Sequence, residues 1–313
     1  MNIKVEMWYY LKKHKVLKNT MEFKKITLAD KKLLLPFLRR DDELTCELSF
    51  TNLLLWQSLY NNCYCVEDDM LYLKSYDDNI VTYSLPFGDM QKGMKRIIEH
   101  CGNPYPDIWA QEGPRFQQFK ALYGEYYDII ESRNEFDYIY NSQDLITLAG
   151  KKYHSKRNHI SAFSKRFDWH YEEITKHNIA KVKACADAWY AQSADRMDDE
   201  LKTEMLGVNM MFDNMEFLGL TGGAVFIDNS VVAFTLGSAI NNVVYNIHIE
   251  KALSGFEAAY TVINREFAAR NAENYKYINR EDDLGLEGLR KSKLSYKPAI
   301  ILPKYYCTKK ENI

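Results

Sequence analysis

The sequence predicts an α+β fold of two domains whose sheets are mixed but mostly antiparallel. The chain has 313 residues, of which 46% are hydrophobic, so it can bury a substantial core, and its length suggests about two domains. Both halves also alternate short runs of β-branched and aromatic residues with helical patterns. This alternation is typical of proteins that combine helices and sheets in one core.

The second half has the clearest order of elements. Three strand-like runs, at 224–227, 231–239 and 243–249, are separated by tight-turn sequences and predict an antiparallel meander. Apolar residues then follow at the spacing of one buried helix face: Phe256, Ala259, Tyr260, Ile263 and Phe267. The predicted order βββαβαβ is completed by a strand at 275–278, a helix at 286–293 and a strand at 299–302.

The first half is predicted to be a similar mixture. An apolar run at 47–60 is dense enough to be core. Asp89 is a candidate N-cap for a helix that Gly102 ends. Helices are expected at 30–38, 89–98 and 115–123, and strands at 63–66, 70–74, 80–85, 108–110, 126–131 and 135–140.

The chain divides into three predicted parts: an N-terminal extension at 1–20, a first domain at 21–148 and a second domain at 149–313. The extension carries five lysines. It is either a basic surface helix or the product of an upstream start codon. The second domain is expected to open with a helix interrupted at Gly150, followed by a strand at 169–174 and a helix at 179–192.

Composition and charge narrow the classes of function. The formal net charge is −2, so a nucleic acid or an anionic lipid must be bound by a local patch rather than by the field of the whole protein. The six cysteines form no Cys-x-x-Cys pair, which favours reduced structural thiols and no metal site. The sequence shows no apolar run of membrane-spanning length and no signal peptide, and these features predict a cytoplasmic protein.

Several short motifs resemble known families. The βββαβαβ order resembles the core of the GNAT acyltransferases, in which an acyl donor lies near the fourth strand and the next helix N-terminus. The end of the chain resembles the C-terminal domain of bacterial phosphatidylglycerol lysyltransferase, at Gly288, Leu289, Arg290, Lys293, Pro298, Pro303, Lys304 and Tyr305. The segments 150–160 and 283–285 are similar to motifs of a soluble bacterial family that shares this domain. The resemblance implies two GNAT-like domains in tandem, the second of the lysyltransferase type.

The predicted catalytic residues lie on the meander and on the helix at 286–293. Simple alternation along the third strand places Asn246, His248 and Glu250 on one face. This face could carry the chemistry, or it could be a sheet face that is open to water. Asp283, Arg290 and Lys293 form a second candidate group, because residues 290 and 293 can face the same way on a helix. The second group is either an ion-pair network or a site for a donor phosphate, with Asp283 orienting the cations or acting as a base.

The predicted donor-binding residues come from two segments. Lys151, Lys152, Lys156 and Arg157 belong to the densest basic run, which is either a phosphate- or RNA-binding surface or a solvated helix face. Ser254 and Gly255 occupy the position of the loop that cradles pyrophosphate in GNAT enzymes that use acetyl-CoA. Here Ser254 and Phe256 replace small residues of that loop, which counts against coenzyme A.

These observations lead to one main hypothesis about function. The family resemblance implies an acyl- or aminoacyltransferase that moves an activated group, with aminoacyl-tRNA as the candidate donor, to an amine or hydroxyl acceptor. The acceptor could be a small molecule, a lipid headgroup or a peptide. The alternatives are a GNAT N-acetyltransferase that depends on acetyl-CoA, and a non-catalytic binding module that keeps the fold.

Overall fold

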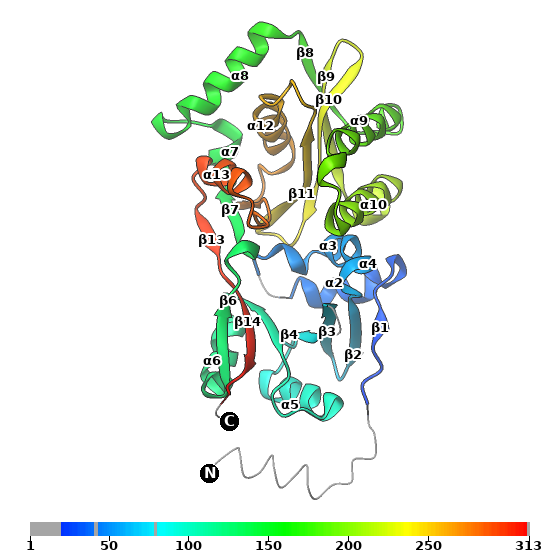
Figure 1. Ribbon diagram of the computed structural model, residues 1–313, viewed down its shortest axis with the longest axis vertical. Coiled ribbons are helices and arrows are strands. Elements are labelled where there is room, and N and C mark those ends of the chain that lie inside the picture. Colours follow the sequence, from blue (N-terminus) through cyan, green and yellow to red (C-terminus); the bar gives the residue numbers. More distant parts are fainter. Residues whose placement is uncertain (1–19, 41–42, 78–79, 312–313) are drawn as a thin grey trace, which may run out of the picture.

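The computed structural model describes residues 20–40, 43–77 and 80–311. Residues 1–19 of the predicted N-terminal extension therefore lie outside the described residues. Within the described ranges the chain forms two mixed seven-stranded sheets, which lie one above the other along the long axis of the molecule (Figure 1).

The first sheet has the strand order β1-β2-β3-β4-β5-β14-β6. Its neighbours pair antiparallel except for β4 and β5, which are parallel. The strands are β1 (Lys24–Lys25), β2 (Cys63–Glu67), β3 (Met70–Asp77), β4 (Ile80–Ser84), β5 (Ile108–Gln111), β6 (Tyr127–Glu131) and β14 (Lys304–Lys309). The helices of this half are α2 (Lys31–Leu38), α3 (Phe50–Leu55), α4 (Gln57–Tyr60), α5 (Met90–Cys101) and α6 (Pro114–Tyr123).

The second sheet has the order β13-β7-β12-β11-β10-β9-β8, with β11 and β12 as its parallel pair. Its strands are β7 (Asp137–Asn141), β8 (Trp169–Glu173), β9 (Thr221–Ile227), β10 (Ser230–Ala239), β11 (Val244–Ala252), β12 (Tyr277–Asn279) and β13 (Ile300–Leu302). The helices are α7 (Ser142–Thr147), α8 (His154–Arg166), α9 (Ile179–Gln192), α10 (Asp199–Asp213), α11 (Met215–Leu218), α12 (Ala259–Asn271) and α13 (Glu287–Ser295). Helices α9 and α10 lie on one side of this sheet, and α12 lies on the other (Figure 1).

The two sheets are built in the same way, and each borrows one strand from the other half of the chain. In each, an antiparallel run of four strands precedes a helix, a parallel strand, a second helix and a last strand. Strand β7 ends the first half but pairs with β12 and β13, whereas β14 ends the second half but pairs with β5 and β6. This repeated order is the tandem GNAT-like fold that the sequence resemblance implied.

The predicted elements of both halves are confirmed with shifts of a few residues at their ends. Asp89 accepts a 2.7 Å hydrogen bond from the backbone N–H of Lys92 and caps α5, and Gly102 ends the helix at φ 68°. The helix expected to be interrupted at Gly150 forms α7 and α8. The strands β1 and β14 were not predicted. The boundary between domains at 148 and 149 stays a prediction, since the sheets exchange strands across it.

One hydrophobic core joins the two halves. It contains Phe37 of α2, Leu73 of β3, Val208 of α10 and Phe234 of β10, all of them buried. Burying apolar surface from both halves in one cluster contributes about 25 cal/mol per Å² removed from water. The two units therefore stabilise each other through a shared interior.

Strand β11 contains a β-bulge that corrects one prediction. Leu236 of β10 pairs with Ile249, but the next residue, Gly237, pairs with Ile247, so His248 is an extra residue on β11. A bulge of this kind reverses the faces of the residues that follow it. The prediction that Asn246, His248 and Glu250 share one face is therefore wrong for Glu250, which faces α12.

No helix in the described ranges combines the length and the apolar character that a membrane crossing requires.

Gly237 is expected to be essential at the bulge. A Cβ atom at this position would lie 2.5 Å from the backbone oxygen of Asn246 and 2.6 Å from the ring of Tyr245. Because a backbone atom cannot move aside cheaply, we expect Gly237→Ala to lower the free energy of unfolding by about 2–3 kcal/mol, measured by urea denaturation. In the matched control Gly288→Ala, the new methyl group meets nothing within 4 Å and lies in α13. The control should raise stability by up to about 1 kcal/mol, and equal effects of the two changes would contradict this account of the bulge.

Candidate functional site

A continuous set of polar side chains lies where the two sheets meet, and we call it the junction cluster. Its members come from the segment 46–52, which precedes β2, from β10, β11 and β12 of the second sheet, from the segment after β12, and from the two exchanged strands. They are Cys46, Glu47, Asn52, Asp137, Ser238, Asn246, His248, Asn279, Glu281 and Lys304.

Lys304 is the centre of one end of this cluster. Its side chain is fully buried, and its ammonium donates a 2.8 Å hydrogen bond to Asp137 Oδ1 and another to Glu47 Oε1. Burial by itself would lower the pKa of Lys304, but the neighbouring carboxyl groups, Asp137 above all, outweigh burial and raise this pKa well above its usual value. Lys304 is thus held as a cation.

Asp137 and Glu47 respond differently to the same cation. Burial would raise the pKa of Asp137, but Lys304, together with hydrogen bonds from Asn279 and the backbone N–H of Cys46, lowers it below the usual value. For Glu47 burial prevails over Lys304 and raises the pKa to about 7. The Glu47 side chain is still 34% exposed. A carboxylate whose pKa is raised above its usual value therefore lies within reach of solvent.

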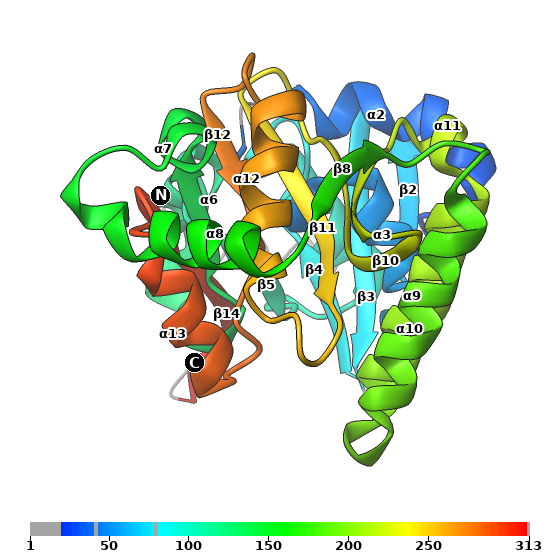
Figure 2. The same ribbon diagram turned by 90° about the horizontal axis from the view of Figure 1, so that it is seen from above.

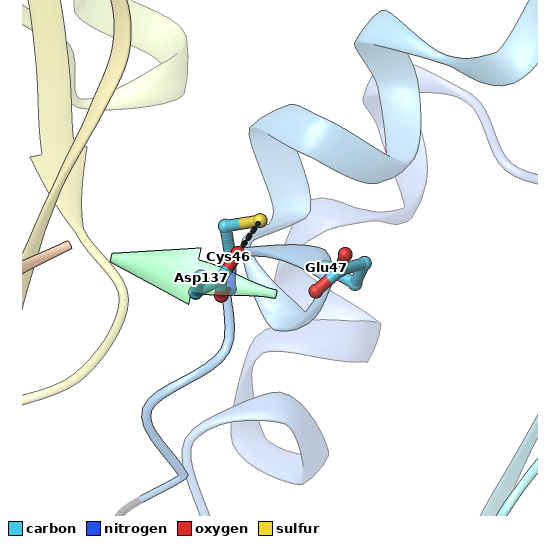
Figure 3. Close-up of side chains that lie close together, drawn as sticks. All are labelled: Cys46, Glu47 and Asp137. Atoms are coloured by element: carbon cyan, nitrogen blue, oxygen red, sulfur yellow. Dashed lines mark hydrogen bonds between the residues drawn. The ribbon is translucent and has the colours of Figure 1, made fainter. Parts of the chain in front are cut away.

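Three potential metal ligands lie side by side at this end: Cys46, Glu47 and Asp137 (Figure 3). Their donor atoms are within 4.8 Å of one another. The ammonium of Lys304 shares the same space, 3.8 Å from Cys46 Sγ. Burial and the neighbouring carboxylates raise the pKa of the Cys46 thiol well above its usual value, and the thiol lies 3.2 Å from Asp137 Oδ1, to which it donates. A protonated thiol beside an ammonium does not fit a metal ion, because thiolate is the form that binds metals.

The other end of the junction cluster surrounds His248, at the bulge. Its Nε2 lies 2.8 Å from Ser238 Oγ, and its Nδ1 lies 2.8 Å from Asn52 Oδ1 and 2.9 Å from Asn246 Nδ2. Asn246 in turn donates a 2.7 Å hydrogen bond to Glu281. The backbone N–H of Glu281 then donates to Asn279, and Asn279 donates to Asp137, so hydrogen bonds connect His248 with Lys304.

Asp283 and Arg290 form a separate ion pair. Both oxygens of the buried Asp283 carboxylate accept 2.8 Å hydrogen bonds from the Arg290 guanidinium, and Tyr138 donates to the same carboxylate at 2.5 Å. Burial would raise the pKa of Asp283, but the hydrogen bonds from Arg290 and Tyr138 lower it to about 2. This is the ion-pair arrangement that the sequence left open. A catalytic role for either residue stays a prediction.

Lys293 does not face the same partner as Arg290. Its buried ammonium donates to the backbone oxygens of Arg280, at 2.5 Å, and Asp282. Glu250 is also apart from the junction cluster, because it binds Arg280 of the segment after β12 and Asn264 of α12. Of the six predicted catalytic residues, the structure thus brings Asn246 and His248 together, pairs Asp283 with Arg290, and leaves Glu250 and Lys293 in other surroundings.

The four predicted donor-binding cations do not form one uniform patch. Lys152 is exposed and pairs with Asp144 at 3.0 Å, and the guanidinium of Arg157 donates to the backbone oxygens of Leu148 and Gly150. Lys151 is exposed as well. Lys156 instead turns inward, so that its ammonium lies 3.7 Å from the centre of the Tyr296 ring.

The backbone N–H groups of Ser254 and Gly255 already donate hydrogen bonds to side chains of the protein. The backbone N–H of Ser254 donates to Gln192 Oε1 at 3.0 Å, and the N–H of Gly255 donates to Glu257 Oε1 at 2.9 Å. These N–H groups would be the ones to bind a pyrophosphate in an acetyl-CoA site. The N–H of Gly255 is bound here by the Glu257 carboxylate, which repels an anion.

Sequence reasoning missed the residues at the Lys304 end of the junction cluster. In the sequence Lys304 belongs to the family motif, Glu47 to a segment predicted to be apolar core, and Asp137 to a predicted strand. A charged residue inside each of three strongly apolar or aromatic runs was the available signal, because such residues are rarely buried unless they are paired.

The ion pair at Asp283 predicts a pH-dependent stability difference. An aspartate whose pKa is lowered on folding contributes stability that is complete above its unfolded pKa of about 3.9 and is lost as the pH falls through the folded pKa. We expect Asp283→Asn to cost about 2 kcal/mol of unfolding free energy at pH 7. The difference from the unmodified protein should shrink between pH 4 and about pH 2. Urea denaturation at several pH values measures this, with exposed Asp128→Asn as the control, and a difference that is constant with pH would contradict it.

Comparison with known proteins places the chain among its relatives. A solved structure of a conserved protein of unknown function from Bacteroides thetaiotaomicron is 37% identical, has a TM-score of 0.86, and matches over 93% of this chain and 100% of that chain. L-PGS from Bacillus licheniformis shares the fold at 15% identity, with a TM-score of 0.59 over 90% of this chain and 92% of its own. An uncharacterized protein of Mycoplasmoides gallisepticum is 22% identical over 190 residues, so the match spans 57% of this chain but only 58% of that protein.

The family assignment follows from the sequence as a whole. Residues 39–308, which include both sheets except β1 and the last residue of β14, match the family described as phosphatidylglycerol lysyltransferase, C-terminal. The chain belongs to this family.

Proposed function

We propose that the protein is an aminoacyltransferase that moves an activated aminoacyl group from a tRNA to an amine or hydroxyl acceptor, with Glu47 as the general base. The observation that carries this proposal is the position of Glu47 at the edge of the junction cluster. Glu47 is a partly exposed carboxylate with a pKa raised to about 7, placed beside a buried ammonium where the two GNAT-like units meet. A general base is most effective when its pKa lies near the working pH.

The proposed reaction begins with proton removal by Glu47. The carboxylate takes the proton from the acceptor amine or hydroxyl while the acceptor attacks the ester carbon of the donor. The tetrahedral intermediate then collapses as the ester C–O bond to the tRNA ribose breaks, and Glu47 gives its proton to the ribose oxygen, which leaves as a hydroxyl. The buried Lys304 holds Glu47 in place through its hydrogen bond and so acts as a positioning residue.

The exposed helix α8 supports a polyanionic donor. Lys151 and Lys152 precede it, and Lys165 and Arg166 lie in its last turn, all of them exposed. Such cations make diffuse contacts with phosphates that depend on salt rather than on base sequence.

The occupied loop at Ser254 and Gly255 weighs against the alternative that acetyl-CoA is the donor. The Glu257 carboxylate accepts from the N–H of Gly255, and that hydrogen bond lowers the pKa of Glu257, so the carboxylate stays charged at neutral pH. A pyrophosphate at the same place would have to displace a negative charge. We therefore propose a donor without coenzyme A.

We expect Glu47→Gln to lower the turnover of the enzyme by about 10²- to 10⁴-fold, because it removes the base but keeps the shape of the side chain. The affinity for the donor should not change. Turnover of the unmodified protein should rise with pH through about 7 and then level off, and the variant should lose this rise. The measurement is the release of labelled amino acid from a mixture of charged tRNAs with amine, lipid-headgroup and peptide acceptors.

The control for this experiment is Glu216→Gln, which changes an exposed glutamate of α11. Its rate should match that of the unmodified protein. Full activity of Glu47→Gln, or a pH profile that the variant retains, would show that Glu47 is not the base.

A second experiment tests the donor. Filter binding of mixed tRNA over a salt series should give a linear fall of log K with log salt. The double variant Lys151→Ala/Lys152→Ala should bind more weakly and reduce the slope by about two, since each lost phosphate contact removes about 0.9.

The double variant Lys25→Ala/Lys32→Ala, which removes two exposed lysines far from α8 in the chain, is the control. The same slope in all three proteins would contradict the assignment of this surface. If the unmodified protein shows no salt-sensitive binding of tRNA, the donor is not a tRNA, and an acetyl-CoA enzyme or a non-catalytic binding module becomes the better reading.

A further inference from the structure

A second group of charged side chains lies on the opposite side of the second sheet from the junction cluster, and we call it the Arg280 cluster. It lies between α8, α12 and the segment that follows α13; α8 passes over α12 and beside α13 (Figure 2). Its members are Tyr140, Lys156, Glu250, Asn264, Arg280 and Tyr296. None of its contacts is used in the reaction proposed above.

Glu250 holds two of these side chains in fixed positions. Arg280 Nη2 donates to Glu250 Oε1 at 2.7 Å, and Asn264 Nδ2 donates to Glu250 Oε2 at 3.1 Å. Each carboxylate oxygen thus has its own donor. The Glu250 carboxylate therefore fixes the orientation of both side chains.

One further polar atom of each of these two side chains has no partner among the described residues, although both atoms are buried. They are Arg280 Nη1, a donor, and Asn264 Oδ1, an acceptor; Asn264 is only 2% exposed. Exchanging the two ends of the Asn264 amide would not help, because an oxygen would then face the Glu250 carboxylate. A buried polar atom without a partner destabilises the protein, so this pair of atoms points to a ligand that offers one acceptor and one donor.

The charges of the cluster point to an anion. Arg280 and Lys156 both contact the Tyr296 ring, with 4.8 Å from the guanidinium carbon and 3.7 Å from the ammonium nitrogen to the ring centre. Glu250 pairs with Arg280 and is the one carboxylate of this cluster among the residues that the structure describes. The ammonium of Lys156 has no hydrogen-bond acceptor in the part of the chain that the structure describes. One positive charge is therefore in excess.

We propose that the Arg280 cluster is a binding site for a small α-hydroxycarboxylate. The carboxylate of the ligand would bridge Arg280 Nη1 and the ammonium of Lys156, and its neighbouring hydroxyl would donate to Asn264 Oδ1. A monoanion neutralises the single excess charge, whereas a phosphate dianion would leave a buried negative charge. The long, flexible stem of Lys156 on the exposed helix α8 allows the ligand to enter and then be covered.

The test is calorimetric titration of the full chain with glycolate as the probe, beside acetate, glycolamide, glycine and inorganic phosphate. Glycolate should bind with a Kd about tenfold lower than that of acetate, since acetate lacks the hydroxyl that satisfies Asn264. Glycolamide, which lacks the charge, should not bind measurably. No saturation by any probe at about 10 mM would overturn the proposal, and tighter binding of glycine or phosphate would overturn the class of ligand.

Two variants connect the binding to the cluster. Lys156→Met keeps the length of the stem and should raise the Kd for glycolate at least about tenfold. Arg280→Lys keeps a cation beside Glu250 but removes the Nη1 donor, and it should weaken binding similarly. Lys165→Met, an exposed change in the last turn of the same helix, should bind like the unmodified protein. Unchanged affinity in both Lys156→Met and Arg280→Lys would overturn the site, whether or not the protein transfers aminoacyl groups.

Discussion

The buried contact between Lys304 and Asp137 is the constraint on which the rest of the structure depends. Asp137 is the first residue of β7, and Lys304 is the first residue of β14, the two strands that the halves exchange. The ion pair therefore lies where the chain crosses from each sheet to the other. Removing one partner of a buried pair leaves an uncompensated charge, at a cost of about 3–5 kcal/mol. The ion pair thus holds β7 and β14 together at the point where the chain crosses between the sheets.

The same crossing also explains why Glu47 lies beside Lys304. A buried cation needs more than one acceptor, and Glu47 supplies the second from the edge of the cluster, where water reaches it. The bulge at His248 sends polar side chains of β11 to both faces of the sheet. It directs Asn246 and His248 to the junction cluster and Glu250 to the Arg280 cluster. One strand thus provides polar groups to both sides of a sheet without opening the apolar core between them.

Much of the fold could be predicted from the sequence because its signals are local. The cap at Asp89, the left-handed Gly102 and the apolar spacing of α12 each depend on a few neighbouring residues. The bulge could not be predicted from alternation, since it depends on how β11 pairs with β10 across the sheet. The pairing of Asp137 with Lys304 joins residues that are far apart in the chain, so no local pattern could reveal which partner neutralises either of them. For the same reason the candidate site was predicted in part at Asn246 and His248 and missed at Glu47.

Because of the strand exchange, the first sheet cannot be completed until β14 has been synthesised. Strands β5 and β6 leave the ribosome early, yet the strand that lies between them is made only near the end of synthesis. At about 5–20 residues per second, the gap in the first sheet stays open for on the order of ten seconds. During this interval the facing edges expose unpaired backbone groups, which are the usual templates for wrong pairing between chains. A chaperone that shields the nascent first half would therefore act on this gap, and fast translation of the second half would shorten the period of exposure.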